Sequence, residues 1–418
     1  MDHFNYKNKT LFAENTSISK IASQIGTPFY CYSHATISRH YKVFSEAFKK
    51  TPTTVCFAVK SNSNLTVLNI LAKLGAGADT VSEGEIRRSI KAGIPAKKIV
   101  FSGVGKTKDE MRYALSVGIG QFNIESFEEL DDLNEVAIKM GLKAPVTFRV
   151  NPDIEAGTHD KISTGRKTDK FGVAWDKSIE IYKQAKEMQG INVIGIACHI
   201  GSQLTSLDPF KDAFKKLVTM IEELKENGHN IKTIDLGGGL GIPYESNTEP
   251  PPAPKDYADM IVETIKHLGC ELILEPGRLI VGNAGILVSK VIRTKDTDHK
   301  NFVIIDAAMN DLARPSLYGA YHEIIPVKEP KDTKTKTIDL VGPICETGDT
   351  FGKDYELPPL KADDLIAMRS AGAYGAVMSS TYNSRLLVPE VLVKGDQYTV
   401  IRPRQTYDEL LGLDRILI

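Results

Sequence analysis

The feature that most constrains the fold is an eightfold alternation of apolar runs and amphipathic stretches. The apolar runs lie at 54–59, 77–82, 98–103, 121–125, 145–150, 193–200, 232–237 and 271–275. Between them, helix-like stretches lie at 64–74, 84–92, 108–117, 126–140, 177–189, 209–227 and 255–268. Strand–helix alternation predicts a parallel sheet. Eight such units in about 240 residues favour a closed (β/α)8 barrel of the TIM type, with an open doubly wound sheet as the alternative.

The alternation of strand-like and helix-like stretches ends at about residue 282. Further apolar runs lie at 286–292, 302–306, 337–341, 364–369, 390–393 and 397–402, with few helical stretches between them. This pattern predicts a second, all-β domain of barrel or sandwich type, which an early strand at 28–32 can join. We therefore expect residues 35–281 to form the α/β barrel, and residues 1–34 together with 282–418 to form the β domain.

Composition excludes several classes of function. The formal net charge is −1, so nothing points to nucleic acid or an anionic membrane as a partner. The five cysteines are scattered without CxxC or Cys/His spacing, so we expect neither a disulfide framework nor a metal site. The sequence starts without a signal-like apolar segment, and no apolar run approaches the ~20 residues that span a bilayer. A reducing cytoplasm is the expected location.

Reactive side chains stand where the barrel strands are predicted to end. The run Val55–Val59 leads directly into Lys60, strand six ends at His199, and strand eight ends at Glu275. The active site of a (β/α)8 barrel lies at the carboxyl ends of its strands. Because an unpaired buried ammonium costs several kcal/mol, Lys60 should face a site mouth or pair with another group. The alternatives are an exposed strand-end lysine and a core histidine bonded to backbone.

The triple glycine Gly237–Gly239 follows strand seven. Backbone without Cβ atoms can approach an anion closely, and the loops after strands seven and eight are the usual phosphate site of this fold. The spacing fits neither a P-loop nor a dinucleotide fingerprint, and a ligand-free tight turn is the alternative. A lysine beside a phosphate cradle suggests pyridoxal phosphate, bound to Lys60 as a Schiff base. Glu275 could then bond the pyridine nitrogen and His199 could stack on the ring.

Ten motifs spread over nearly the whole chain resemble one family. They are Phe57–Asn62, Ala78–Glu85, Lys170–Gly172, His199–Gln203, Gly237–Gly241, Glu275–Arg278, Arg314–His322, Gly342–Asp349, Gly372–Gly375 and Tyr382–Arg385. Together they resemble the fold type III pyridoxal-phosphate-dependent decarboxylases, whose fold is alanine racemase-like. The resemblance is strongest to the branch that converts meso-2,6-diaminopimelate to L-lysine and carbon dioxide, the last step of lysine biosynthesis. One departure is Leu386-Leu387, where relatives often carry a proline and a basic or apolar residue.

The resemblance implies roles position by position. Lys60 would carry the cofactor, and Cys345, contributed by the second subunit of a homodimer with shared active sites, would protonate Cα. Together with Lys60, the implied cofactor contacts are Asp79, His199, Ser202, Gly238, Gly239, Glu275, Gly277, Arg278 and Tyr374. The implied substrate contacts are Arg278, Arg314, Tyr318, Glu346 and Tyr374.

The residue types suit a substrate with an amino acid at each end. Arginine forks bind a distal carboxylate bidentately, and a carboxylate such as that of Glu346 suits a distal ammonium. Two alternatives stay open: a related decarboxylase of ornithine, arginine or carboxynorspermidine, and a cofactor-free regulator that keeps the fold. The polar stretch His159–Phe171 has the length and composition of a lid.

Overall fold

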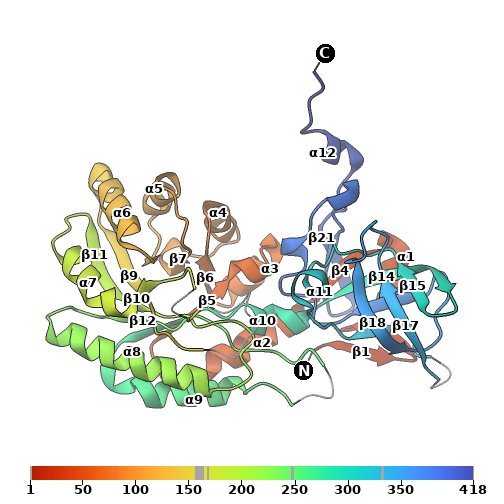
Figure 1. Ribbon diagram of the computed structural model, residues 1–418, viewed down its shortest axis with the longest axis horizontal. Coiled ribbons are helices and arrows are strands. Elements are labelled where there is room, and N and C mark those ends of the chain that lie inside the picture. Colours follow the sequence, from red (N-terminus) through yellow and green to blue (C-terminus); the bar gives the residue numbers. More distant parts are fainter. Residues whose placement is uncertain (1, 156–163, 167–168, 246–248, 331–333, 418) are drawn as a thin grey trace. The chain divides into compact units, whose positions relative to one another are not determined.

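The computed structural model describes residues 2–155, 164–166, 169–245, 249–330 and 334–417. Its contacts divide the chain into two compact units (Figure 1). The barrel unit comprises His40–Ile242 and Glu249–Ile280. The β unit comprises Met1–Arg39, Pro243–Thr248 and Val281–Ile418. Part of the predicted lid at 159–171 lies outside the described residues.

Eight parallel strands form a closed ring in the barrel unit. In ring order they are β5 (Thr53–Ala58), β6 (Gly77–Thr80), β7 (Ile99–Phe101), β8 (Gln121–Ile124), β9 (Ala144–Asn151), β11 (Ile191–Ala197), β12 (Thr233–Asp235) and β13 (Glu271–Leu274). The ring closes because β8 pairs with β9 and β13 pairs with β5. This confirms the barrel predicted from the eightfold alternation, and the open sheet is excluded. A further short strand, β10 (Val173–Ala174), pairs with the end of β9.

Amphipathic helices surround the ring of strands (Figure 1). They are α2 (His34–Ala47), α3 (Leu65–Lys73), α4 (Glu83–Lys91), α5 (Lys108–Val117), α6 (Phe127–Met140), α7 (Ser178–Lys186), α8 (Asp208–Glu226) and α9 (Pro254–Ile265). The side chains of Asn64, Ser82 and Ser126 accept hydrogen bonds from the first-turn N–H groups of α3, α4 and α6. Thr107 forms a capping box with Glu110 at the start of α5. These caps fix where each helix begins, and therefore fix the loops that follow the carboxyl ends of the strands.

The β unit is built on a second sheet. Its main path runs β18 (Thr350–Leu357), β17 (Lys336–Val341), β15 (Asn301–Ile305), β14 (Gly285–Asp296), β4 (Phe29–Ser33), β20 (Glu390–Lys394) and β21 (Gln397–Arg402). The strand β19 (Leu365–Met368) pairs with β14 and with β16 (Ile324–Pro326). The early strand β4 lies between β14 and β20, as their pairing registers show. A mostly-sheet second domain, as predicted, is therefore present.

The first residues of the chain form elements that the sequence analysis did not predict. The strands β1 (Phe4–Lys7), β2 (Thr10–Ala13) and β3 (Thr16–Ser17) make a small antiparallel sheet, followed by α1 (Ile18–Ile25). Their apolar side chains join those of β4, β14 and β20 in one core cluster. Three short α-helices, α10 (Arg278–Val281), α11 (Arg314–Tyr318) and α12 (Tyr407–Leu411), complete the described α-helices.

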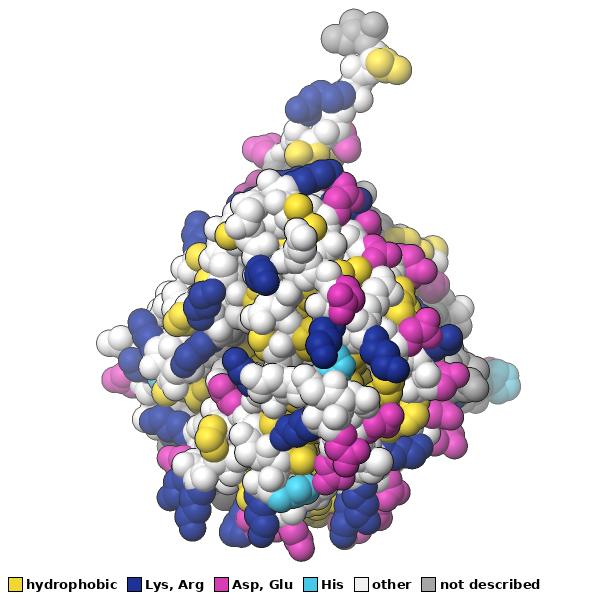
Figure 2. Space-filling model, turned by 90° about the vertical axis from the view of Figure 1, so that its left-hand side faces the viewer, with side chains coloured by type: hydrophobic (Ala, Val, Ile, Leu, Met, Phe, Trp, Pro, Cys, Tyr) yellow, Lys and Arg dark blue, Asp and Glu magenta, His cyan; other side chains and the backbone are white. Residues whose placement is uncertain are grey.

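The described surface is mixed in charge. On the face shown in Figure 2, basic and acidic side chains both occur over much of the surface. Among the described helices, none combines the length and the hydropathy required to cross a membrane.

Candidate active site at the carboxyl ends of the barrel strands

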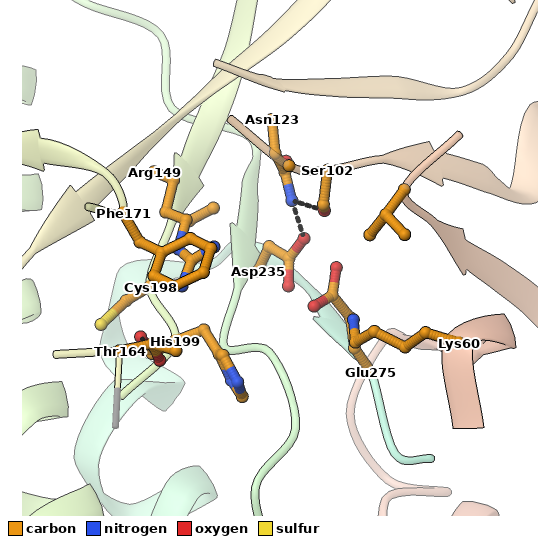
Figure 3. Close-up of a pocket in the computed structure, with 13 residues that line it drawn as sticks. Lys60, Ser102, Asn123, Arg149, Thr164, Phe171, Cys198, His199, Asp235 and Glu275 are labelled. Atoms are coloured by element: carbon orange, nitrogen blue, oxygen red, sulfur yellow. Dashed lines mark hydrogen bonds between the residues drawn. The ribbon is translucent and has the colours of Figure 1, made fainter. Parts of the chain in front are cut away.

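A cavity opens among the loops that follow the barrel strands, and all of its lining residues belong to the barrel unit (Figure 3). Its volume is about 170 Å³. The lining residues are Lys60, Val81, Ser102, Gly103, Asn123, Arg149, Thr164, Phe171, Ala197, Cys198, His199, Asp235 and Glu275. The structure therefore brings together three residues that the sequence analysis selected from strands distant in the chain, namely Lys60, His199 and Glu275.

Lys60 lies in a single turn of 3-10 helix, Val59–Ser61, directly after β5. Its Nζ is 2.5 Å from Oδ2 of Asp79, which stands on the neighbouring strand β6. The side chain of Asp79 is fully buried, whereas that of Lys60 is 39% exposed. The lysine amine is thus held by a buried carboxylate while remaining accessible to a ligand in the cavity.

Glu275 and Asp235 are two buried carboxyl groups at the ends of neighbouring strands. Asp235 is the last residue of β12 and Glu275 follows the neighbouring strand β13. Burial raises the pKa of Glu275 well above its ordinary value, and the charges of Asp235 and Asp79 raise it further. Burial also raises the pKa of Asp235. The Oε1 atom of Glu275 has no hydrogen-bond partner among the described residues.

His199 stands two residues after the end of β11. The backbone N–H of Gly238 donates to its Nδ1 at 3.3 Å, which places a proton of the neutral ring on Nε2. Desolvation lowers the pKa of His199 well below its ordinary value, and the charges of Arg149 and Lys60 lower it further. The ring is therefore neutral at physiological pH, which suits it to stack on another flat ring.

The glycines near these residues occupy places where a side chain would not fit. A Cβ at Gly238 would lie 2.3 Å from the carbonyl oxygen of Glu275. Gly239 has a φ of +110°, and a Cβ there would lie 2.5 Å from the carbonyl oxygen of Gly201. A Cβ at Gly277 would lie 2.9 Å from the Cβ of Ala58, next to the turn that carries Lys60. Bare backbone of this kind can point N–H groups at an anion.

Two more predicted contacts join this region. The Nη2 of Arg278, at the start of α10, donates to the Oγ of Ser202 at 3.1 Å. Arg278 is buried. Pyridoxal phosphate requires an amine for its aldehyde, a carboxyl group for its ring nitrogen and a site for its phosphate. Lys60, Glu275, whose Oε1 has no partner among the described residues, and the glycines supply these groups, so the residues present fit that cofactor.

The sequence analysis did not select Arg149, although it stands near the end of β9 and lines the cavity. Its Nη1 lies 3.3 Å from Oε1 of Glu125, and its guanidinium carbon is 4.7 Å from the ring centre of Phe171. Asn123, Ser102 and Asp235 were also missed as site residues. The sequence did contain a signal for them, because polar residues at the strand ends of a barrel are candidate site residues. However, successive side chains of a strand point to opposite faces, and the sequence did not show which of these residues point into the barrel.

The predicted substrate contacts other than Arg278 lie in the β unit. Arg314 begins α11 and is buried, and its Nη1 is 2.8 Å from Nε2 of His322. Its guanidinium carbon lies 4.8 Å above the ring centre of Tyr244. Tyr318 is the last residue of the same helix. The stacked and hydrogen-bonded guanidinium is held in a defined orientation within this unit.

Cys345 and Glu346 are exposed and lie in the loop between β17 and β18. The hydroxyl of Tyr382 donates to Oε2 of Glu346 at 3.0 Å. Tyr374 has a φ of +55°, a left-handed conformation that is a genuine outlier for a bulky residue. Such strain is concentrated at functional sites. The roles of these residues at a substrate stay predictions.

Comparison with known proteins gives concordant results. The model of the family described as "Pyridoxal-dependent decarboxylase, pyridoxal binding domain" matches residues 34–282. The diaminopimelate decarboxylase of Pseudomonas aeruginosa is 51% identical over 417 residues, which cover 100% of both chains. That of Vibrio cholerae is 49% identical over 419 residues, again covering 100% of both. A crystal structure of diaminopimelate decarboxylase from M. jannaschii in complex with L-lysine is similar, with a TM-score of 0.95 and 40% identity, covering 100% of this chain and 98% of that chain.

Proposed function

This chain belongs to the pyridoxal-dependent decarboxylases, and we propose that it decarboxylates meso-2,6-diaminopimelate to L-lysine and carbon dioxide, the last step of lysine biosynthesis. The observation that carries the proposal is the 51% identity with a diaminopimelate decarboxylase over the whole length of both chains. The geometry supports the proposal, because one cavity is lined by the accessible amine of Lys60 and by the buried Glu275, whose Oε1 accepts no hydrogen bond from the described residues.

Pyridoxal phosphate supplies an electron sink for the electron pair left at Cα when carbon dioxide departs. In our proposal the Lys60 amine would hold the cofactor's aldehyde carbon covalently, and Glu275 would accept a hydrogen bond from the pyridine nitrogen. The neutral His199 ring would stack on the pyridine ring. The glycines 238, 239 and 277, with Ser202, would hold the phosphate, and Asp79 would orient the lysine amine through their contact at 2.5 Å.

The substrate's second amino-acid end explains the residues assigned to it. The guanidinium groups of Arg278 and Arg314 would bind the distal carboxylate, with Tyr318 and Tyr374 beside it, and Glu346 would bind the distal ammonium. Ornithine has no distal carboxylate, so an ornithine decarboxylase would not need Arg278 and Arg314 to bind one. The arginine pair therefore argues against ornithine and arginine as substrates, and only weakly against carboxynorspermidine.

We propose further that the protein works as a homodimer and that Cys345, from the second subunit, delivers the proton to Cα. The exposure of Cys345 within its own chain supports this assignment. The five cysteines are free, which agrees with a reducing, cytoplasmic location.

The decisive experiment measures carbon dioxide release from the meso, LL and DD isomers of diaminopimelate, and from ornithine, arginine and carboxynorspermidine. We expect release from the meso isomer and formation of L-lysine. Lys60→Ala should lose both this activity and the visible absorbance of the bound cofactor, whereas a matched substitution of the exposed Lys50→Ala should keep both. Faster release from ornithine or arginine would favour the related decarboxylases. A parent protein that gains no absorbance with added cofactor would point to the regulator.

A further inference from the structure

Buried polar side chains at the same end of the barrel as Glu275 form a connected layer of hydrogen bonds. The Nδ2 of Asn123 donates to the Oγ of Ser102 and to Oδ2 of Asp235, each at 3.0 Å (Figure 3). The Nε2 of Gln121 donates to the same Oδ2, also at 3.0 Å. All of these residues are buried, and Asp235 is only 1% exposed. The decarboxylation mechanism proposed above assigns no role to this layer.

The two carboxyl groups of the buried pair have very different surroundings. Asp235 accepts three N–H groups, because the backbone N–H of Gly237 donates to its Oδ1 at 3.0 Å in addition to the Gln121 and Asn123 amides. Oε1 of Glu275 accepts none from the described residues. Hydrogen bonds from N–H donors favour the ionised form of a carboxyl group, whereas burial without donors favours the protonated form. The two carboxyl groups therefore hold one proton between them. Glu275 is protonated and Asp235 is ionised.

We propose that Asp235 is a positioning residue that sets the protonation of the cofactor ring, acting through Glu275. This inference rests on the proposed function, since it requires the pyridine nitrogen to bind against Glu275. When the cofactor binds, the O–H bond of Glu275 would break, its proton would pass to the lone pair of the pyridine nitrogen, and the bonding electron pair would stay on the Glu275 carboxylate. No charge is added to the buried site by this transfer. The fixed negative charge of Asp235 keeps the proton on the Glu275–nitrogen unit.

The other ionisable groups around Glu275 do not replace Asp235 in this role. Asp79 and Lys60 also face Glu275, but they pair with each other at 2.5 Å, so that their opposite charges largely cancel there. Cys56, on β5, is neutral because burial raises the pKa of its thiol well above the ordinary value. The charge of Asp235 is the next cause, after burial, of the raised pKa of Glu275.

The test measures the ring nitrogen directly, independently of turnover. Each protein is loaded with pyridoxal phosphate labelled with 15N at the ring nitrogen, and the nitrogen chemical shift is followed against pH. In Asp235→Asn we expect the pH of half-deprotonation to fall by at least about one unit, the scale of a close charge's effect. Gln121→Met removes one donor and so weakens the ionised form of Asp235, which should shift the midpoint in the same direction by less. The dissociation constant of the cofactor is measured alongside.

Thr147→Val is the matched control. Thr147 is fully buried in the same layer and its Oγ1 donates to Oδ1 of Asn123, but it carries no charge. We expect its titration to match that of the parent. An unchanged midpoint in Asp235→Asn, or an equal shift in Thr147→Val, would overturn the inference. If Asp235→Asn does not fold, Gln121→Met takes its place in the test. An unchanged midpoint in Gln121→Met would then overturn the inference. A parent protein that retains no labelled cofactor overturns the proposed function as well, and this outcome is distinct from cofactor retained without a shift.

Discussion

At the scale of single residues, the buried Glu275 carboxyl makes the stability of the cofactor-free chain depend on pH. Its pKa is raised well above the unfolded value of about 4.3, so between these values the folded state binds more protons than the unfolded state. The unfolding free energy should therefore fall as pH rises above about 4.3, with a slope approaching about 1.4 kcal/mol per pH unit from this group. Glu275→Gln should remove that contribution. Urea unfolding of parent and variant between about pH 4 and pH 8 measures the difference.

The control for this prediction is Glu271→Gln, at the start of the same strand, where the side chain is exposed. Its pH profile should run parallel to that of the parent. If the Glu275→Gln profile also ran parallel to the parent profile, Glu275 would not hold the extra proton.

Some residues of the candidate site were predictable from the sequence, and others were not. Lys60, His199 and Glu275 were predictable as candidates because each follows an apolar run whose end is visible in the sequence. Arg149 and Asp235 stand at strand ends too, but only the closed ring shows that both side chains line the cavity. Two of the three N–H groups that donate to Asp235 belong to β8, whose residues Gln121 and Asn123 are 114 and 112 positions away in the chain. No local pattern carries that information.

At the scale of elements, the barrel strands were predictable because parallel strands buried on both faces appear as continuous apolar runs. The helices that follow them were predictable from their amphipathic spacing. The strand β18 (Thr350–Leu357) was missed because it pairs only with β17 at an edge and is mostly polar. The strands β1 to β3 were missed because they are short and joined through left-handed residues such as Asn8, Lys9 and Glu14, which are not glycine.

The loop after β12 supports a prediction about the glycine cradle. Gly238→Ala would place a methyl group 2.3 Å from the carbonyl oxygen of Glu275, so that backbone must move. We expect a loss of ~1–3 kcal/mol in unfolding free energy, as in other overpacked sites. Because the same movement displaces the cradle from a phosphate, cofactor binding should weaken as well. Urea unfolding of the cofactor-free protein and titration with pyridoxal phosphate measure the two effects.

Gly105→Ala is the matched control, since a Cβ there would meet no atom within 4 Å and its φ is not left-handed. It should leave both unfolding and cofactor affinity close to those of the parent. A Gly238→Ala protein that is destabilised but binds the cofactor as tightly as the parent would mean that this glycine serves packing alone.

At the scale of the whole molecule, the predicted roles divide between the two units. The predicted cofactor contacts lie in the barrel unit except for Tyr374, and the predicted substrate contacts lie in the β unit except for Arg278. The predicted proton donor Cys345 is also in the β unit and is exposed.

The homodimer proposal is tested by combining two inactive chains. Lys60→Ala lacks the amine that holds the cofactor, and Cys345→Ala lacks the proton donor, so each should have little activity alone. In a hybrid dimer with shared sites, one site would contain both the intact Lys60 and the intact Cys345. Co-expression with two different tags and tandem purification isolates the hybrid, whose carbon dioxide release should exceed that of either variant. Hybrids prepared from two differently tagged Lys60→Ala chains provide the control. If the isolated Lys60→Ala/Cys345→Ala hybrid were no more active than this control, Cys345 would act within its own chain or not at all. If no hybrid formed and ultracentrifugation found single chains, the dimer itself would be refuted.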